Sequence, residues 1–234
     1  IEGLRVAYGT SEVVKGVSLS VEKGEVLGIV GESGSGKSQT ILAVLGLLPP
    51  AARTRSRGLW LGETRLDRLT PAARAVVPGR RIGYIPQEPM SNLDPCFPIG
   101  AQLTVPLRLV HGLTATAAEA RAREVLARVG IRDIDRVMRA YPHQISGGMA
   151  QRVLIAGAVA GRPEVLLADE PTTALDVTVQ AEVLDLLRSL QAEYRMALII
   201  VTHNFGVVAD LCDRVAVMQS GEVVETGPVG QVFA

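Results

Sequence analysis

Residues 31 to 38 read Gly-Glu-Ser-Gly-Ser-Gly-Lys-Ser, between an apolar run at Val26–Val30 and a helix-like segment at Lys37–Leu47. This is the pattern GxxxxGK[ST] in the strand–loop–helix context that it requires. Glycines let the backbone curl so that its N–H groups point at phosphate oxygens, and the helix start adds partial positive charge. The sequence therefore predicts a nucleoside triphosphate site formed by Gly31, Glu32, Ser33, Gly34, Ser35, Gly36, Lys37, Ser38 and Gln39.

Outward from this loop, apolar runs of strand length recur along the chain. Uninterrupted apolar runs suit a sheet that is covered on both faces, and alternation with helical segments favours parallel strands. The fold class expected is therefore α/β with a mostly parallel sheet. The predicted strands are Val26–Val30, Arg81–Ile85, Val165–Ala168 and Ala197–Val201, and the predicted helices are Lys37–Leu47, Thr178–Tyr194 and Phe205–Leu211.

Both ends of the chain read differently from the core. Leu4–Tyr8 and Val17–Val21 alternate apolar and polar residues, which predicts antiparallel strands, and Arg214–Gln219 with Glu222–Thr226 predicts a hairpin. From about residue 99 to 144 the strand pattern stops, and two or three helices fit there. One of them is expected to begin near Thr116, where Thr116 and Glu119 match a capping box.

A pair of carboxylates, Asp169 and Glu170, follows the apolar run Val165–Ala168. Charged residues at the carboxyl ends of parallel strands belong to the ligand crevice. Asp169 is expected to hold Mg²⁺ together with Ser38, and Glu170 to orient the attacking water as a catalytic residue.

A second helix start capable of binding an anion occurs at Ser146-Gly147-Gly148-Met149. Ser146 is a suitable N-cap, and the two glycines leave backbone N–H groups open. One γ-phosphate does not need two helix starts from one chain. The economical interpretation is that this one serves a nucleotide held by a second copy or a second, related domain.

The composition limits the classes of protein. The chain has 234 residues and balances 24 basic side chains against 24 acidic ones. Nucleic-acid-binding domains usually show a basic excess, so no nucleic acid is expected as a partner, although a local basic patch stays open. No apolar run approaches the roughly 20 residues that a spanning helix needs, so any membrane role comes through a partner. Cys96 and Cys212 lie in no CxxC pattern, which favours reduced thiols.

With these motifs in this order, nearly the whole chain resembles the ABC ATPases. Residues 145–149 resemble the family signature LSGGQ, which completes the partner's ATP site across a head-to-tail dimer; Met149 stands where the family has glutamine. By the same resemblance, Gln87 senses Mg²⁺, Asp176 belongs to the loop that contacts the opposite site, His203 is the catalytic switch histidine, and Tyr8 stacks on adenine.

The resemblance also implies an architecture. It is a single cassette in which about 1–98 and 160–234 form a P-loop NTPase core with an N-terminal antiparallel β subdomain, and about 99–159 form an inserted helical subdomain with the signature.

Within the family, four stretches resemble the oligopeptide and dipeptide import group; they are residues 31–39, 87–95, 141–149 and 174–180. The resemblance implies an ATPase that binds ATP and Mg²⁺ and drives transport from the cytoplasmic face of the inner membrane. Its expected partners are a second cassette, transmembrane permease subunits and an extracytoplasmic solute-binding protein. Import of another solute such as nickel, a regulatory cassette, and a soluble ATPase acting on ribosomes or DNA stay open.

Overall fold

The structure is a computed structural model that describes residues 1–173 and 175–233. It has an α/β fold, and its contacts divide the chain into two compact units. The first contains Ile1–Pro78 and the chain from Ala197 onward, and the second contains Gly79–Met196. The division into a core and a helical subdomain at about 99–159 stays a prediction.

The first unit is built around β3 (Val26–Val30), every residue of which is buried. Strand β3 pairs in parallel with β9 (Ala197–Val201) and with β10 (Arg214–Gln219). Strand β11 (Glu222–Pro228) returns antiparallel to β10 through Ser220 and Gly221, both at positive φ as a tight hairpin requires. Helices of the first unit include α1 (Lys37–Leu45), α9 (Phe205–Leu211) and α10 (Val229–Val232).

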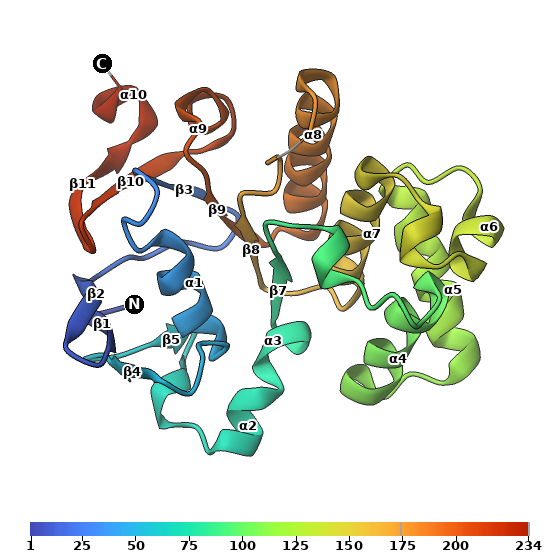
Figure 1. The fold of residues 1–234 in the computed structure, drawn as a ribbon, viewed down its shortest axis with the longest axis horizontal. Helices are drawn as coiled ribbons and strands as arrows, with labels where there is room; N and C mark the ends of the chain where they lie inside the picture. Colours follow the sequence, from blue (N-terminus) through green and yellow to red (C-terminus); the bar gives the residue numbers. More distant parts are fainter. Residues whose placement is uncertain (174, 234) are drawn as a thin grey trace. The chain divides into compact units, whose positions relative to one another are not determined.

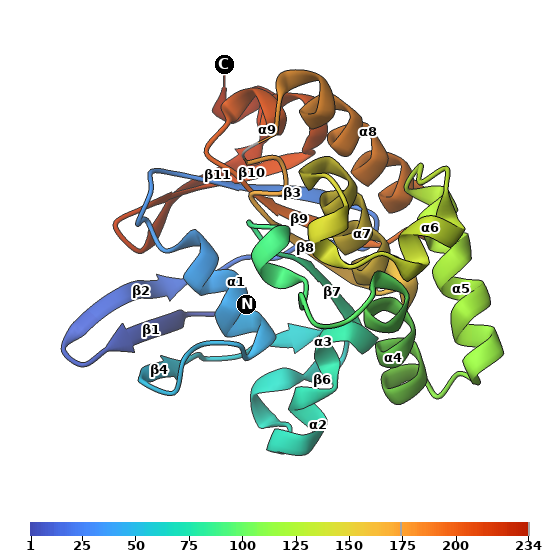
Figure 2. The same cartoon turned by 45° about the vertical axis from the view of Figure 1, so that its right-hand side comes forward.

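Beside this core, the first unit carries an antiparallel sheet in the order β2-β1-β4, seen in Figure 2. Its strands are β1 (Leu4–Tyr8), β2 (Ser11–Val17) and β4 (Ala52–Arg55). The predicted strand at Val17–Val21 is therefore wrong. Gly16, at φ +92°, does not break the strand but sits in it as a bulge, where the partner of β1 shifts from Val17 to Lys15.

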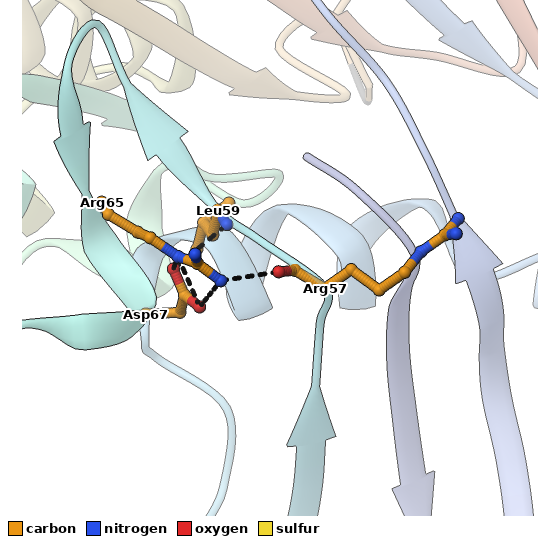
Figure 3. A network of polar contacts seen from close by, with 4 residues as sticks. All are labelled: Arg57, Leu59, Arg65 and Asp67. Atoms are coloured by element: carbon orange, nitrogen blue, oxygen red, sulfur yellow. Dashed lines mark hydrogen bonds and ion pairs between the residues drawn. The ribbon is translucent and has the colours of Figure 1, made fainter.

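Between β4 and the second unit, polar contacts shape short elements that the sequence patterns did not predict. Figure 3 shows the guanidinium of Arg65 bonded to both carboxylate oxygens of Asp67 and, at 2.6 Å, to the carbonyl of Arg57. The hydrogen bond from Arg65 lowers the pKa of Asp67. The elements are β5 (Trp60–Leu61), β6 (Thr64–Arg65), a 3-10 turn η1 (Leu66–Arg68), α2 (Pro71–Ala75) and α3 (Val77–Arg80).

The second unit pairs β7 (Ile82–Ile85) in parallel with β8 (Val165–Asp169). Figure 1 shows α4 to α7 gathered in one group. Helix α5 begins at Ala115 with Thr114 as its N-cap, so the capping box at Thr116 is wrong: the Thr114 hydroxyl, two residues earlier, accepts from the Ala117 N–H. The helices are α4 (Ile99–His111), α5 (Ala115–Arg128), α6 (Ile134–Arg139), α7 (Gly147–Ala160) and α8 (Val177–Tyr194), with 3-10 turns η2 (Met90–Asn92) and η3 (Pro142–Gln144).

Candidate functional site

The glycine loop joins β3 to α1 in the first unit, and two of its glycines are required by space. Gly31 has φ +151°, and a Cβ there would lie 2.1 Å from the carbonyl oxygen of Met218. Gly36, the N-cap of α1, has φ +99°, and its Cβ would lie 2.7 Å from the carbonyl oxygen of Val13. Because Gly36 has no side chain, no side-chain cap covers the first N–H groups of α1. This helix start is therefore open to an anion.

Lys37 lies inside the curve of this loop. Its side chain is only 5% exposed, and Nζ donates to the carbonyl oxygens of Gly31 and Glu32 at 2.8 Å each. The hydroxyl of Ser35 is buried and has no hydrogen-bond partner among the described residues. Buried hydroxyls are normally hydrogen-bonded, so an orphaned one suits a loop shaped around a ligand.

Three further residues that the sequence predicted as part of the site lie in the first unit: Tyr8, Gln39 and His203. Tyr8 ends β1, and its hydroxyl donates to Oε1 of Gln39 on α1 at 2.7 Å. Tyr8, predicted to stack on adenine, is therefore in contact with Gln39, the last residue of the predicted triphosphate site. His203 is exposed in the short connection between β9 and α9, directly before the N-cap Asn204.

In the second unit, the acidic pair ends β8. Asp169 is buried at 3% exposure, and Glu170 has φ +47°, a conformation that costs a non-glycine residue on the order of 1–3 kcal/mol and that clusters at active sites. Glu170 Oε2 accepts hydrogen bonds from Gln87 Nε2 at 3.1 Å and from the Thr173 hydroxyl at 2.8 Å. Gln87 and Glu170, predicted separately as site residues, are thus in contact.

Near the acidic pair, Tyr84 on β7 is held neutral. Burial, and after it the negative charge of Asp169, raise the pKa of Tyr84 to about 12.

The second helix start opens α7. Ser146 is the N-cap, and its hydroxyl accepts from the Met149 N–H at 3.3 Å. A Cβ on Gly147 would meet nothing within 4 Å, and one on Gly148 would lie 3.6 Å from Val179 on α8. Asp176 caps α8 by accepting from the Val179 N–H at 3.0 Å. The starts of α7 and α8 are therefore neighbours.

Two residues that sequence reasoning assigned no role hold α7 in place. Gln151 is 1% exposed, and its Nε2 donates to the carbonyl of Pro171, the residue after Glu170, at 2.7 Å. Arg152 donates to the carbonyl of Val129 at 2.6 Å and pairs with Glu182 of α8 at 2.5 Å. The sign in the sequence was a Gln-Arg pair inside an otherwise apolar helix.

The family model described as "ABC transporter" matches residues 14–173, more than half of the chain. The chain belongs to the ABC transporter family. The dipeptide transport ATP-binding protein DppD of Escherichia coli (strain K12) is 42% identical over 237 residues, which cover 100% of this chain and 72% of that relative. The glutathione import ATP-binding protein GsiA of Salmonella typhimurium is 45% identical over 243 residues, which cover 100% of this chain but only 39% of that protein.

Solved cassettes of the same family share the fold. A dimeric structure of the ATP-binding cassette MJ0796 in a post-hydrolysis state, bound to ADP and Pi, superposes with a TM-score of 0.79 at 26% identity and covers 97% of this chain and 98% of that one. The cassette cbiO1 from Clostridium perfringens, part of the ABC transporter complex cbiONQ, gives a TM-score of 0.79 at 28% identity, covering 99% and 90%.

Among the described helices of this chain, none combines the length and the apolar character needed to cross a bilayer. The segment at 173–176, predicted to contact the opposite site, includes Ala174, which lies outside the described residues, whereas Asp176 is described as the N-cap of α8.

Proposed function

We propose that this chain is the ATP-hydrolysing cassette of an ABC importer for oligopeptides or dipeptides. One observation carries the proposal: a single chain has two helix starts suited to a phosphate, one with Lys37 in its loop and one, at Ser146, without a cation in its first turn. Relatives named for dipeptide, oligopeptide and glutathione transport support the class of solute.

In this proposal the glycine loop binds the triphosphate, and Lys37 turns from the loop carbonyls to the β- and γ-phosphates. Tyr8 stacks on adenine. Ser38, Asp169 and Gln87 supply hydroxyl, carboxylate and amide oxygens, the hard donors that suit Mg²⁺. When bound, Mg²⁺ neutralises charge on the phosphates.

Hydrolysis needs a group that orients water. Glu170 fits this role because two side-chain donors fix its carboxylate before any nucleotide arrives. Here Glu170 accepts a proton from the attacking water and His203 contacts the γ-phosphate. These residues act by position and charge, since phosphoryl transfer depends mainly on both.

The second helix start acts in trans. Ser146, Gly147, Gly148 and Met149 contact the nucleotide of a second cassette, identical or different, and Asp176 lies beside that contact. The pair works at the cytoplasmic face of the inner membrane, held there by permease subunits that meet the segment after Gln87. An extracytoplasmic solute-binding protein delivers the peptide.

Mixing two inactive variants tests the shared site. We expect Glu170→Gln and Ser146→Arg each to abolish ATP hydrolysis alone. Mixed, they form a dimer in which one site combines the intact Glu170 of one copy with the intact Ser146 of the other. Partial recovery of phosphate release on mixing supports the proposal; a mixture as inactive as its components contradicts it.

Reconstitution tests the solute. The cassette, with its permeases in vesicles, should raise its ATPase rate when a peptide-loaded binding protein is added, and the same binding protein without peptide is the control. Stimulation by nickel or another solute alone contradicts peptide import, and co-purification with ribosomes or DNA in place of membranes contradicts transport.

A further inference from the structure

The antiparallel sheet of the first unit carries a row of basic side chains that the proposed function does not use. On β1, Arg5 lies directly opposite Lys15 of β2 and directly opposite Arg55 of β4. Side chains in such cross-strand pairs lie on one face, close enough to interact, and like charges there are destabilising. Three aligned cations on three neighbouring strands therefore call for a compensating negative charge.

The same residues border a concave surface. A hollow of about 510 Å³, the basic hollow, is lined by Gly3, Arg5, Lys15, Gly16, Arg55, Ser56 and Arg57. Four of these seven residues are cationic and none is acidic. In a chain whose formal net charge is zero, this is a concentrated positive region.

Little within the chain offsets this charge. Glu12 pairs with Arg5 at 2.9 Å, but Arg5 stays 53% exposed. Within the described residues, no ion pair is found for Lys15, Arg55 or Arg57. Figure 3 shows that Arg57 gives only its carbonyl to the Arg65 contact, while its side chain extends the other way, toward the blue strands.

Two glycines form the floor on which the guanidinium groups lie. A Cβ on Gly3 would stand 2.7 Å from Nε of Arg57, and a Cβ on Gly16 would stand 3.4 Å from Nη2 of Arg5. Both residues have positive φ, at +56° and +92°. A larger residue at Gly3 would require the Arg57 side chain to shift, and positive φ disfavours a side chain at both positions.

The hollow is separate from the candidate ATP site. Along β1, Leu4, Val6 and Tyr8 alternate with Arg5 and Ala7, so Arg5 points to the face opposite Tyr8. A ligand on this face would not compete with adenine for the Tyr8 ring.

We propose that the basic hollow formed by Arg5, Lys15, Arg55 and Arg57 is a second anion site that binds a phosphate group. A guanidinium donates two parallel hydrogen bonds to a phosphate, and one phosphate group brings close to two negative charges to a single point. A peptide carboxylate brings one charge, which matches the converging cations less well. A free phosphate compound and a phospholipid with a phosphomonoester headgroup, such as phosphatidic acid, both carry this doubly charged group.

Calorimetry with pyrophosphate tests the site, with saturating ADP added to occupy the glycine loop. We expect Arg55→Ala and Arg57→Ala each to weaken binding about tenfold, since a charge-assisted hydrogen bond is worth roughly that factor. Arg53→Ala is the matched control: Arg53 is exposed on the same strand, has the same charge and does not line the hollow. Its affinity should equal that of the unmodified protein.

Co-sedimentation with vesicles separates the two sources. Vesicles of phosphatidylcholine with phosphatidic acid, but not of phosphatidylcholine alone, should retain the protein if a lipid supplies the phosphate, and Arg55→Ala should abolish retention. Pyrophosphate binding without retention on vesicles indicates that a free phosphate compound is the ligand.

Four outcomes would overturn the proposal: equal affinity for pyrophosphate in all variants, an equal loss of affinity in Arg53→Ala, no binding of either probe, or binding of polyglutamate in place of pyrophosphate. ATP hydrolysis by Arg55→Ala is measured separately, so a failure here is distinct from a failure of the cassette function.

Discussion

Gln87 donates from Nε2 to Oε2 of Glu170 at 3.1 Å, across 83 positions of sequence. Gln87, the second residue after β7, thereby orients the carboxylate of Glu170, which directly follows β8. Because the Thr173 hydroxyl donates to the same oxygen at 2.8 Å, two side-chain donors orient Oε2 of Glu170.

Glu170→Gln tests the role of this carboxylate. The amide keeps the size of the side chain but cannot take a proton from water, so we expect ATP binding to persist and hydrolysis to fall by about 10²–10⁴-fold. Phosphate release measures the loss, and gel filtration with ATP should show an accumulated dimer. Turnover at the unmodified rate would remove Glu170 from this role.

Gly147→Ala tests whether the start of α7 acts on a partner. An added Cβ meets nothing within 4 Å in this chain, and alanine favours helix by up to about 1 kcal/mol over glycine, so thermal stability should hold or rise. ATP hydrolysis should nevertheless fall if another copy's nucleotide approaches this backbone.

Thr114→Ala is the matched control for this helix start, since Thr114 caps α5 in the same unit as Ser146 caps α7. It should lower stability by about 1 kcal/mol without lowering ATPase activity per folded molecule. A Gly147→Ala protein with full activity would argue against contact in trans.

Tyr8 tests adenine stacking. Tyr8→Phe removes the hydrogen bond to Gln39 but keeps the ring, so affinity for ATP should change little. Tyr8→Ala removes the ring and should weaken ATP binding about tenfold, since stacking on a base is worth roughly 1–3 kcal/mol. Fluorescence titration with a nucleotide analogue measures both, and equal affinities in the two variants would exclude stacking.

Tyr84 predicts a pH dependence. Its pKa is raised from 10.0 to about 12 in the fold, so the neutral form is favoured in the native state. Below pH 10 the tyrosine is neutral in both the folded and the unfolded chain, so the free energy of unfolding keeps its full value. As the pH rises from 10 through about 12, the tyrosine ionises in the unfolded chain but not in the folded one, so the free energy of unfolding decreases. Tyr84→Phe should flatten this alkaline loss in urea unfolding, with Tyr141→Phe, at an exposed tyrosine, as the control. If the free energy of unfolding falls with pH equally steeply in the unmodified protein, Tyr84→Phe and Tyr141→Phe, the raised pKa of Tyr84 is contradicted.

Much of the fold could be predicted because its core strands are short and apolar. The boundaries predicted for β1, β3, β9, β10 and α9 match the structure. Short polar elements could not be predicted from the sequence. Strand β4 has the sequence Ala-Arg-Thr-Arg, in which apolar and polar residues do not alternate. The turn at Leu66–Arg68 depends on contacts of the Arg65 side chain, which form only in the folded chain. At Gly16 a bulge with positive φ keeps β2 continuous, so the strand is Ser11–Val17, whereas the apolar–polar alternation predicted one at Val17–Val21.

In the candidate site, the sequence predicted which residues matter but not how they meet. The positive φ of Glu170 and its contact with Gln87 arise from tertiary structure, which no local pattern encodes. Gln151 was missed because a buried amide inside a helix is recognisable only once its acceptor, the Pro171 carbonyl, is placed.

Arg152 joins three segments: its own helix α7, the carbonyl of Val129 after α5, and Glu182 on α8. Helix α8 begins at Val177 and α7 begins at Gly147, so the contact between Arg152 and Glu182 lies less than two turns inside each helix and links the two helix starts. This contact favours joint displacement of the two helix starts. The residues proposed to contact a second cassette, at the starts of α7 and α8, would therefore form one rigid surface rather than two independently moving loops.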